Sequence, residues 1–285
     1  MAQKRGSIVA MRAFVLVALL LLSGCTPVQF ANSLVSRDLQ VSRDVAYGPL
    51  PRHRLDLYRF GGNPDVRGAV LFLHGGYWDS GDKRDYPFLA DTLAEQGYLV
   101  AVANYRLVPE ASFPAFVQDA ALALRWLAEN AGAEPLFVMG HSAGAHIGAL
   151  LVYDERFLSE VGLEPDAVAG FIGLAGPYDF LPLAPDDARA RAALGDEPGP
   201  DTQPITFVDG SEAPALLLVG EADTTVDPAN SLRLAERIRA RGGAVTLERY
   251  AGLGHVELLG ALARAGRSLA PRVLEDVLAF LEQPD

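Results

Sequence analysis

Residues 136–152 read LFVMGHSAGAHIGALLV. An apolar run leads into a serine that stands between two glycines, and an alanine-rich stretch follows. A short apolar run that ends in glycine is typical of a buried strand, and the stretch 143–154 predicts a helix. Ser142 is therefore expected on a sharp strand-to-helix turn, where the pattern G-x-S-x-G forms a nucleophile elbow. A turn residue without chemistry is the alternative, and the rest of the chain must decide between the two.

Strand-like and helix-like segments alternate on both sides of this stretch. This order is typical of a mainly parallel sheet with helices on both faces, so we expect an α/β fold. The 285 residues suffice for one large core. Strands are expected at 54–60, 69–76, 99–106, 136–140, 167–176, 215–223 and 244–250, and helices at 85–97, 113–132, 143–154, 228–243 and 271–283.

One segment, 177–212, interrupts the alternation. It is rich in proline, aspartate and glycine and lies between two expected strands. Long connections of this kind are often functional, so we interpret 177–212 as a lid or substrate-pocket insertion. A loop with no role in substrate choice is the alternative.

The N-terminus has the pattern of a secretory signal. Basic residues precede the apolar run 13–22, which is too short to span a bilayer. It ends in LSGC, residues 22–25, which resembles a bacterial lipobox with cleavage before a lipid-modified cysteine. Cys25 is the only cysteine in the chain. We expect a lipoprotein signal peptide over 1–24, a lipid anchor at Cys25, a tether over 25–43 that includes a first helix, and a catalytic domain over 44–285.

The expected location follows from this pattern. Thr26 stands after the cysteine, where an aspartate often marks retention in the inner membrane. Its absence resembles the outer-membrane pattern, so we expect a lipid-anchored protein of the cell envelope, at the periplasmic face of the outer membrane. An ordinary signal peptide with a chance cysteine is the alternative. The formal net charge of −12 argues against a nucleic-acid partner, and no pattern specifies an oligomeric state.

A serine nucleophile needs a base, and the chain has five histidines. His141 and His146 flank the serine and are expected to point elsewhere. His74 ends an expected strand and is expected to order a loop, and His53 precedes the sheet. His255, in a glycine-containing loop after the last strand, is expected at the same sheet edge as Ser142. We therefore predict His255 as the base, with an ordinary surface histidine as the alternative.

The base needs an acid that fixes its tautomer. Asp223 ends the strand ALLLVGEAD and precedes His255, which gives the order Ser, Asp, His of α/β hydrolases. Asp227 lies four residues later and is a possible substitute. Asp179 follows the preceding strand and is a weaker rival. We predict Asp223.

The reaction also needs backbone donors for a tetrahedral oxyanion. The N–H of Ala143, directly after the serine, is one expected donor. HGGYW, residues 74–78, is expected to supply others from Gly75 and Gly76, with Tyr77 as a further option. Tyr77 and Trp78 are expected to line the substrate pocket, or else to pack in the core.

Together these motifs resemble the α/β-hydrolase superfamily. HGGYW, NYRLVPEASFPAFVQDA (104–120), GHSAG, GEAD and GLGH are similar to its esterase branch, which includes hormone-sensitive-lipase-like carboxylesterases and kynurenine formamidases. The resemblance spans about residues 45–283. HGGYW departs from the HGGG of the lipase branch and is closer to the formamidase form, which leaves the substrate open.

The residues and the resemblance imply a serine hydrolase of carboxylic esters that forms an acyl-enzyme on Ser142. Its expected partner is a small-molecule ester, and no metal or cofactor is expected, because the mechanism needs none and the histidines are not at ligand spacing. The first alternative is an arylformamidase that cleaves N-formylkynurenine, which HGGYW favours and the lipobox disfavours. The second is a hydrolase-fold binding protein without catalysis.

Overall fold

The computed structural model describes residues 26–61 and 66–283. Its centre is an eight-stranded sheet in the order β1-β2-β4-β3-β5-β6-β7-β8. Strands β3 to β8 are parallel, while β2 runs antiparallel to both β1 and β4. The predicted mainly parallel sheet is confirmed. The strands are β1 (Leu39–Ala46), β2 (Arg54–Phe60), β3 (Ala69–Leu73), β4 (Leu99–Ala103), β5 (Leu136–His141), β6 (Gly170–Leu174), β7 (Ala215–Gly220) and β8 (Val245–Tyr250).

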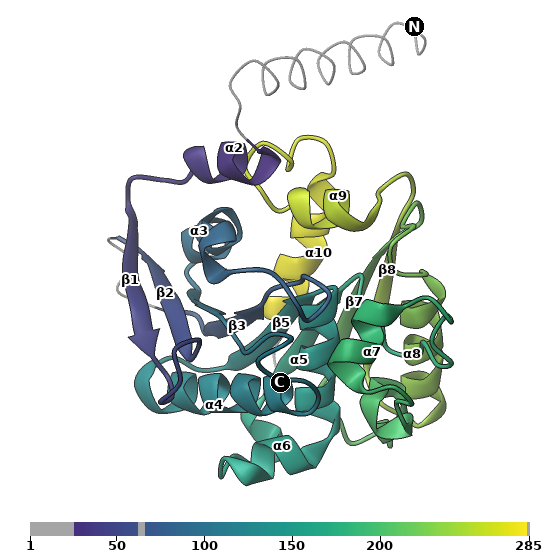
Figure 1. The fold of residues 1–285 in the computed structure, drawn as a ribbon. Coiled ribbons are helices and arrows are strands. Elements are labelled where there is room, and N and C mark those ends of the chain that lie inside the picture. Colours follow the sequence, from purple (N-terminus) through teal and green to yellow (C-terminus); the bar gives the residue numbers. More distant parts are fainter. Residues whose placement is uncertain (1–25, 62–65, 284–285) are drawn as a thin grey trace, which may run out of the picture.

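Helices cover both faces of the sheet (Figure 1). Side chains of α4 (Ala115–Asn130), α5 (Ala143–Tyr153) and α8 (Ala229–Ala240) share one core, and those of α3 (Pro87–Glu95), α9 (His255–Gly260) and α10 (Pro271–Leu281) share the other. Successive residues of a strand point to opposite faces, so Leu71 and Leu73 of β3 lie in the first core and Val70 and Phe72 in the second. This double burial explains the near-continuous apolar runs of the sequence.

The segment predicted as a tether contains part of the fold, which corrects the boundary at residue 44. A helix, α2 (Pro27–Ser33), occurs within it as expected, but β1 begins at Leu39 and pairs with β2. This strand was missed because it lies at the sheet edge and carries Ser42, Arg43 and Asp44, so that most of its residues stay partly or fully exposed. Edge strands lack the apolar runs by which central strands are recognised.

The predicted insertion 177–212 is an ordered layer of short elements. It holds α7 (Ala188–Leu194) and two 3₁₀ turns at Pro200–Thr202 and Pro204–Phe207. The Asn230 side chain of α8 accepts hydrogen bonds from the backbone N–H groups of Tyr178 and Asp179, at 3.0 and 2.9 Å. Further along, the Phe113 N–H donates to the Ala193 carbonyl at 2.7 Å. The insertion is thereby attached to α8 at one end and to the segment before α4 further along. A further helix, α6 (Glu155–Glu160), follows α5 directly.

The predicted signal peptide and Cys25 lie outside the described residues. Over 26–61 and 66–283, none of the helices has the length and hydrophobicity that a membrane span requires.

Candidate active site

Ser142 lies at the turn between β5 and α5 in a strained backbone conformation. Its φ and ψ angles are 56° and −123°, outside the regions that L-residues favour. The turn is held because the Ser142 N–H donates to the Leu174 carbonyl of β6 at 2.9 Å. Strain of this kind persists only where the surrounding structure fixes it, and it is typical of a nucleophile elbow.

The two glycines of GHSAG let this turn pack against its neighbours. A Cβ atom on Gly144 would lie 2.1 Å from the Leu73 carbonyl oxygen of β3. On Gly140 it would lie 2.3 Å from the carbonyl oxygen of Gly144. Both distances are impossible for real atoms, so only glycine permits α5 to begin directly beside β3. The motif therefore has a steric reason that comes from the sheet itself.

His255 and Asp223 are hydrogen-bonded to each other near Ser142. The His255 Nδ1 lies 2.8 Å from Asp223 Oδ2, and the Asp223 side chain is fully buried. The other carboxylate oxygen accepts from the backbone N–H groups of Thr225 and Val226, at 2.8 and 2.9 Å. A carboxylate fixed at both oxygens holds the imidazole with Nε2 free for proton transfer. His255 is the first residue of α9 rather than part of a loop as expected from the sequence.

The two rival carboxylates have other partners. An oxygen of Asp227 accepts from the Ala229 N–H at the start of α8, at 2.9 Å. Asp179 forms an ion pair with Arg233 of α8, at 2.5 Å. Of the three aspartates considered from the sequence, the structure brings Asp223 to His255.

The HGGYW segment forms a tight turn beside the elbow. A Cβ atom on Gly75 would lie 3.1 Å from the Ser142 Cβ, which shows how closely the two turns approach. Gly76 has a φ of 130°, and Tyr77 and Trp78 also have positive φ values, at 51° and 58°. Within the described part of the chain, the backbone N–H groups of Gly76, Tyr77 and Ala143 have no hydrogen-bond acceptor. Donors left free in this way suit an oxyanion.

A buried histidine connects this turn to α5 and to the insertion. The Trp78 indole N–H donates to His146 Nδ1 at 3.2 Å, and His146 Nε2 lies 2.8 Å from the Thr202 carbonyl. Since the carbonyl only accepts, the ring carries its proton on Nε2. Burial lowers the pKa of His146 to about 4, which keeps the ring neutral at pH 7. Trp78 itself is only 4% exposed and packs in the core, yet its ring also lines a cavity at Ser142.

The remaining histidines have structural partners. His141 Nε2 lies 3.1 Å from the His255 carbonyl, and burial, followed by the nearby His255, lowers its pKa to about 3. His74, which was expected to order a loop, has its Nδ1 2.8 Å from the Gly75 carbonyl. His53 is paired with the buried carboxylate of Asp119, at 2.9 Å.

Two cavities meet at Ser142. One, of about 200 Å³, is bounded by Trp78 and by Phe180 and Ala190 of the insertion. The other, of about 460 Å³, also contains His255. Both are at the carboxyl ends of the parallel strands, where open α/β sheets place ligands. The insertion 177–212 therefore forms a wall of the candidate site.

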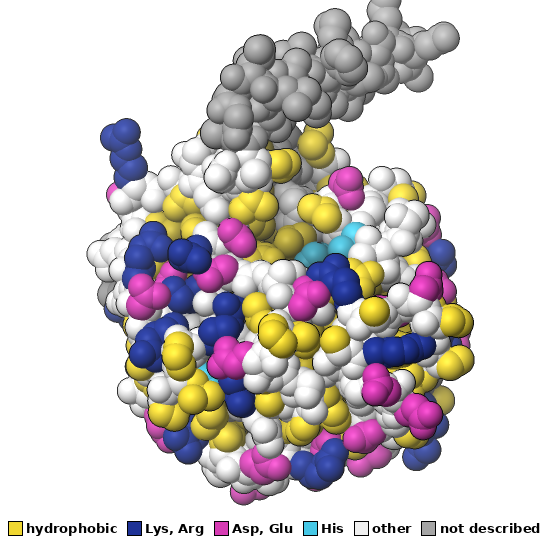
Figure 2. All heavy atoms as spheres, in the orientation of Figure 1, with side chains coloured by type: hydrophobic (Ala, Val, Ile, Leu, Met, Phe, Trp, Pro, Cys, Tyr) yellow, Lys and Arg dark blue, Asp and Glu magenta, His cyan; other side chains and the backbone are white. Residues whose placement is uncertain are grey.

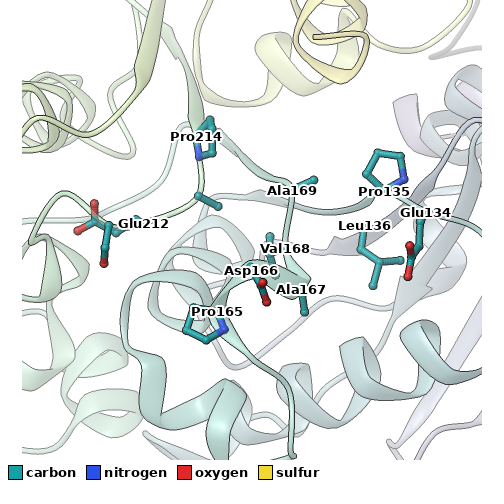
Figure 3. Close-up of a pocket in the computed structure, with 12 residues that line it drawn as sticks. Glu134, Pro135, Leu136, Pro165, Asp166, Ala167, Val168, Ala169, Glu212 and Pro214 are labelled. Atoms are coloured by element: carbon teal, nitrogen blue, oxygen red, sulfur yellow. The ribbon is translucent and has the colours of Figure 1, made fainter. Parts of the chain in front are cut away.

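A larger hollow lies elsewhere on the molecule. Its volume is about 760 Å³, and Pro135, Ala169 and Pro214 lie in its wall, just before or at the starts of β5, β6 and β7 (Figure 3). This is the amino end of the parallel strands, whereas Ser142 lies at their carboxyl end. Its volume alone does not make it the site of chemistry.

Several residues of the site were missed from the sequence. Thr225 lines both cavities at Ser142, and Val28 and Ala31 of α2 line the larger one. Val28 and Ala31 stand more than 40 residues before the next residue of that cavity, and Thr225 stands 83 residues after Ser142. A single sequence carries no signal for contacts over such separations. His146 could have been suspected, because a histidine in an otherwise small and apolar buried helix needs a hydrogen-bond partner.

The strand order, the elbow and the histidine–aspartate pair define an α/β hydrolase. The chain belongs to the BD-FAE family, whose model matches residues 55–238. It is 30% identical over 278 residues to a probable isoprenylcysteine alpha-carbonyl methylesterase of Oryza sativa subsp. japonica, with 86% of this chain and 64% of the relative covered. It is 24% identical to a kynurenine formamidase of Danio rerio, with coverages of 78% and 77%.

A solved structure has the same fold. It is esterase B of Lactobacillus rhamnosis, inhibited with a tributyrin phosphonate, with a TM-score of 0.76 and 21% identity. The alignment covers 96% of this chain and 94% of that one. The chain spans less than two thirds of the length of the plant methylesterase. Its family rests on the BD-FAE model and its fold on the solved structure.

Proposed function

We propose that this protein is a carboxylic ester hydrolase that works through an acyl-enzyme. The observation that carries the proposal is Ser142 on its strained turn, in one cavity with the hydrogen-bonded pair His255–Asp223. The names of the relatives support the reaction class, since two of the three proteins described above are named as esterases.

In this mechanism Ser142 Oγ attacks the ester carbonyl and His255 Nε2 takes its proton. Asp223 holds the imidazole and stabilises the imidazolium. The backbone N–H groups of Gly76 and Ala143 bind the oxyanion, with the Gly75 and Tyr77 N–H groups as the other candidates in the same turn. The C–O bond to the alcohol then breaks, and His255 returns the proton to the leaving oxygen. Water, activated by His255, attacks the acyl-enzyme and releases Ser142.

The test compares p-nitrophenyl butyrate with N-formylkynurenine as substrates. We expect rapid turnover of the ester and a loss of at least about 10³-fold in kcat for Ser142→Ala, His255→Ala and Asp223→Asn. Asp179→Asn is the matched control, because Asp179 is paired with Arg233. Full activity in Asp223→Asn would move the acid to Asp227 or Asp179.

Formamide hydrolysis is the second candidate function. HGGYW and the likeness to a kynurenine formamidase favour it. A strong preference for N-formylkynurenine, with turnover that is lost in Ser142→Ala, would establish formamide hydrolysis instead of ester hydrolysis. Absence of turnover on both substrates would favour a binding protein with a hydrolase fold.

We also propose that Cys25 carries a lipid anchor at the periplasmic face of the outer membrane. The proposal rests on the basic residues, the apolar run 13–22 and LSGC. It predicts that the protein partitions into outer-membrane vesicles and that Cys25→Ser moves it to the soluble fraction. Unchanged partitioning of the Cys25→Ser variant would overturn it.

A further inference from the structure

The two cavities at Ser142 differ in which catalytic group they reach. The larger contains His255 in its wall, together with His141 and Ser142. The described residues around the smaller cavity include Ser142 and Ala143 but not His255. Because of this difference, the alcohol half and the acyl half of an ester are expected to occupy different cavities.

The leaving alcohol must lie where His255 can protonate it. Nδ1 of His255 is occupied by Asp223, so Nε2 delivers the proton to the leaving oxygen. That oxygen and the group attached to it therefore lie in the larger cavity. The acyl group, which stays on Ser142, takes the smaller one.

The larger cavity is built for an apolar group. Its walls include Val28 and Ala31 of α2, Phe88 of α3, and Leu259 of α9. Figure 2 shows hydrophobic side chains and histidine around a hollow on the face between α2 and α9. With more than twice the volume of its neighbour, this cavity favours a bulky hydrocarbon over methanol or ethanol.

The wall formed by α2 is fixed in place. The Asn32 side chain donates to the Asp85 carbonyl at 3.2 Å and accepts from the Phe88 N–H at 3.0 Å. One amide thus ties α2 to the start of α3. The cavity wall is therefore a defined part of the site.

The smaller cavity limits the length and the charge of the acyl group. Trp78, Phe180 and Ala190 bound it, and about 200 Å³ accommodates a short chain. Asp187 and Asp227 also line it, and their carboxylates accept backbone N–H groups at the starts of α7 and α8. Their negative charge disfavours an acyl group that carries a second carboxylate.

We propose that the substrates are esters of short, uncharged acids with bulky apolar alcohols, either long aliphatic or aromatic. This inference rests on the proposed function, because it assigns the two halves of an ester to the two cavities of the same site. In such substrates the alcohol half is larger than the acyl half.

Two series of esters test the claim on the purified full-length protein, with acid release as the readout. The first is methyl, butyl and octyl acetate, whose alcohols are all primary and similar as leaving groups. The second is ethyl acetate, butyrate and octanoate. We expect kcat/KM to rise at least 10-fold along the first series and to fall at least 10-fold from butyrate to octanoate.

Single substitutions test which cavity sets the alcohol preference and which sets the acyl preference. Ala31→Trp fills the larger cavity and is expected to lower the octyl-to-methyl ratio of kcat/KM at least fivefold. Ala190→Trp fills the smaller one and is expected to lower the butyrate-to-acetate ratio. Ser33→Trp, on the same helix as Ala31 but outside the cavity wall, is the matched control for the first ratio.

The outcomes separate the inference from the proposed function. Turnover that favours long acids over long alcohols would overturn the inference and leave the esterase standing. Equal effects of Ala31→Trp and Ser33→Trp would also overturn it. No turnover in either series would contradict the proposed function itself.

Discussion

The imidazole of His146 contacts three segments that the chain order keeps far apart. Through Trp78 it holds the HGGYW turn, through Thr202 it holds the insertion, and it lies on the helix that Ser142 begins. Neither of the two hydrogen bonds of its ring goes to Ser142 or His255. Its effect on turnover is therefore expected to be positional, through the donors and walls that it keeps in place.

We predict that His146→Phe lowers kcat at least 10-fold while the protein still folds. Phenylalanine matches the ring size but leaves the Trp78 N–H and the Thr202 carbonyl without partners, each at a cost of about 1–3 kcal/mol. Initial rates with p-nitrophenyl butyrate and urea unfolding measure the two effects.

His53→Phe is the matched control, because His53 is also buried but is paired with Asp119 away from Ser142. It is expected to reduce stability and to spare kcat. Equal kcat values for the two variants would contradict the positional role of His146.

The elbow is the part of the site that the sequence predicts best. Ser142, its two glycines and the apolar run before them are contiguous, and the steric demand that selects them is local. Asp223 and His255 could be named because each follows a strand whose end faces the same sheet edge. The hydrogen bond between Trp78 and His146 could not be predicted, because it joins two segments 68 residues apart.

At the scale of elements, α7 is attached to the HGGYW turn by one side chain. Arg189 pairs with Asp79, and its guanidinium lies 4.3 Å from the centre of the Tyr77 ring. An exposed ion pair and a cation–π contact contribute on the order of 1 kcal/mol each, and salt weakens the ion pair. One of the contacts that hold the insertion beside Ser142 therefore depends on ionic strength.

We predict that Arg189→Met lowers kcat/KM by a factor of about 3–10 and makes it independent of salt. In the native protein kcat/KM should decline modestly between 0.05 and 0.5 M NaCl, as the ion pair is screened. Stopped-flow or steady-state assays over this range provide the measurement.

Arg191→Met serves for comparison, because Arg191 lies on the same helix and bonds to the Ala184 carbonyl instead. The same salt response in native protein and Arg189→Met would rule out the attachment as the cause.

The elements themselves were predicted unevenly from the sequence. The central strands and α4, α5, α8 and α10 have long apolar patterns and lie close to their expected ranges. β1 was missed because it is exposed at the edge. α9 was assigned to a loop because its six residues follow Gly252 and Gly254, which resemble turn signals.

For the whole molecule, burial of neutral histidines couples stability to pH. Burial lowers the pKa of His74 and His146 to about 4 and that of His141 to about 3. In the unfolded chain these groups titrate near 6.5, so below that pH the unfolded state binds more protons than the folded state. The stability they contribute is complete above pH 6.5 and is lost as the pH falls toward 4 and below.

We predict that the free energy of unfolding falls by several kcal/mol between pH 7.5 and pH 5. Each histidine contributes a slope of up to about 1.4 kcal/mol per pH unit in this range. Urea titrations at the two pH values measure the loss, and His146→Phe should make it smaller. A free energy of unfolding that stays constant down to pH 5 would contradict the prediction.

Under the proposed mechanism, the larger cavity at Ser142 would also decide which nucleophile completes the reaction. Once the alcohol had left, water would have to reach the acyl group from the side of His255, through the larger cavity that His255 lines. Apolar walls retain a hydrocarbon alcohol better than they retain water. An alcohol held there would attack the acyl group in place of water, so we expect the walls proposed to select the substrate to favour transesterification as well when alcohols are abundant.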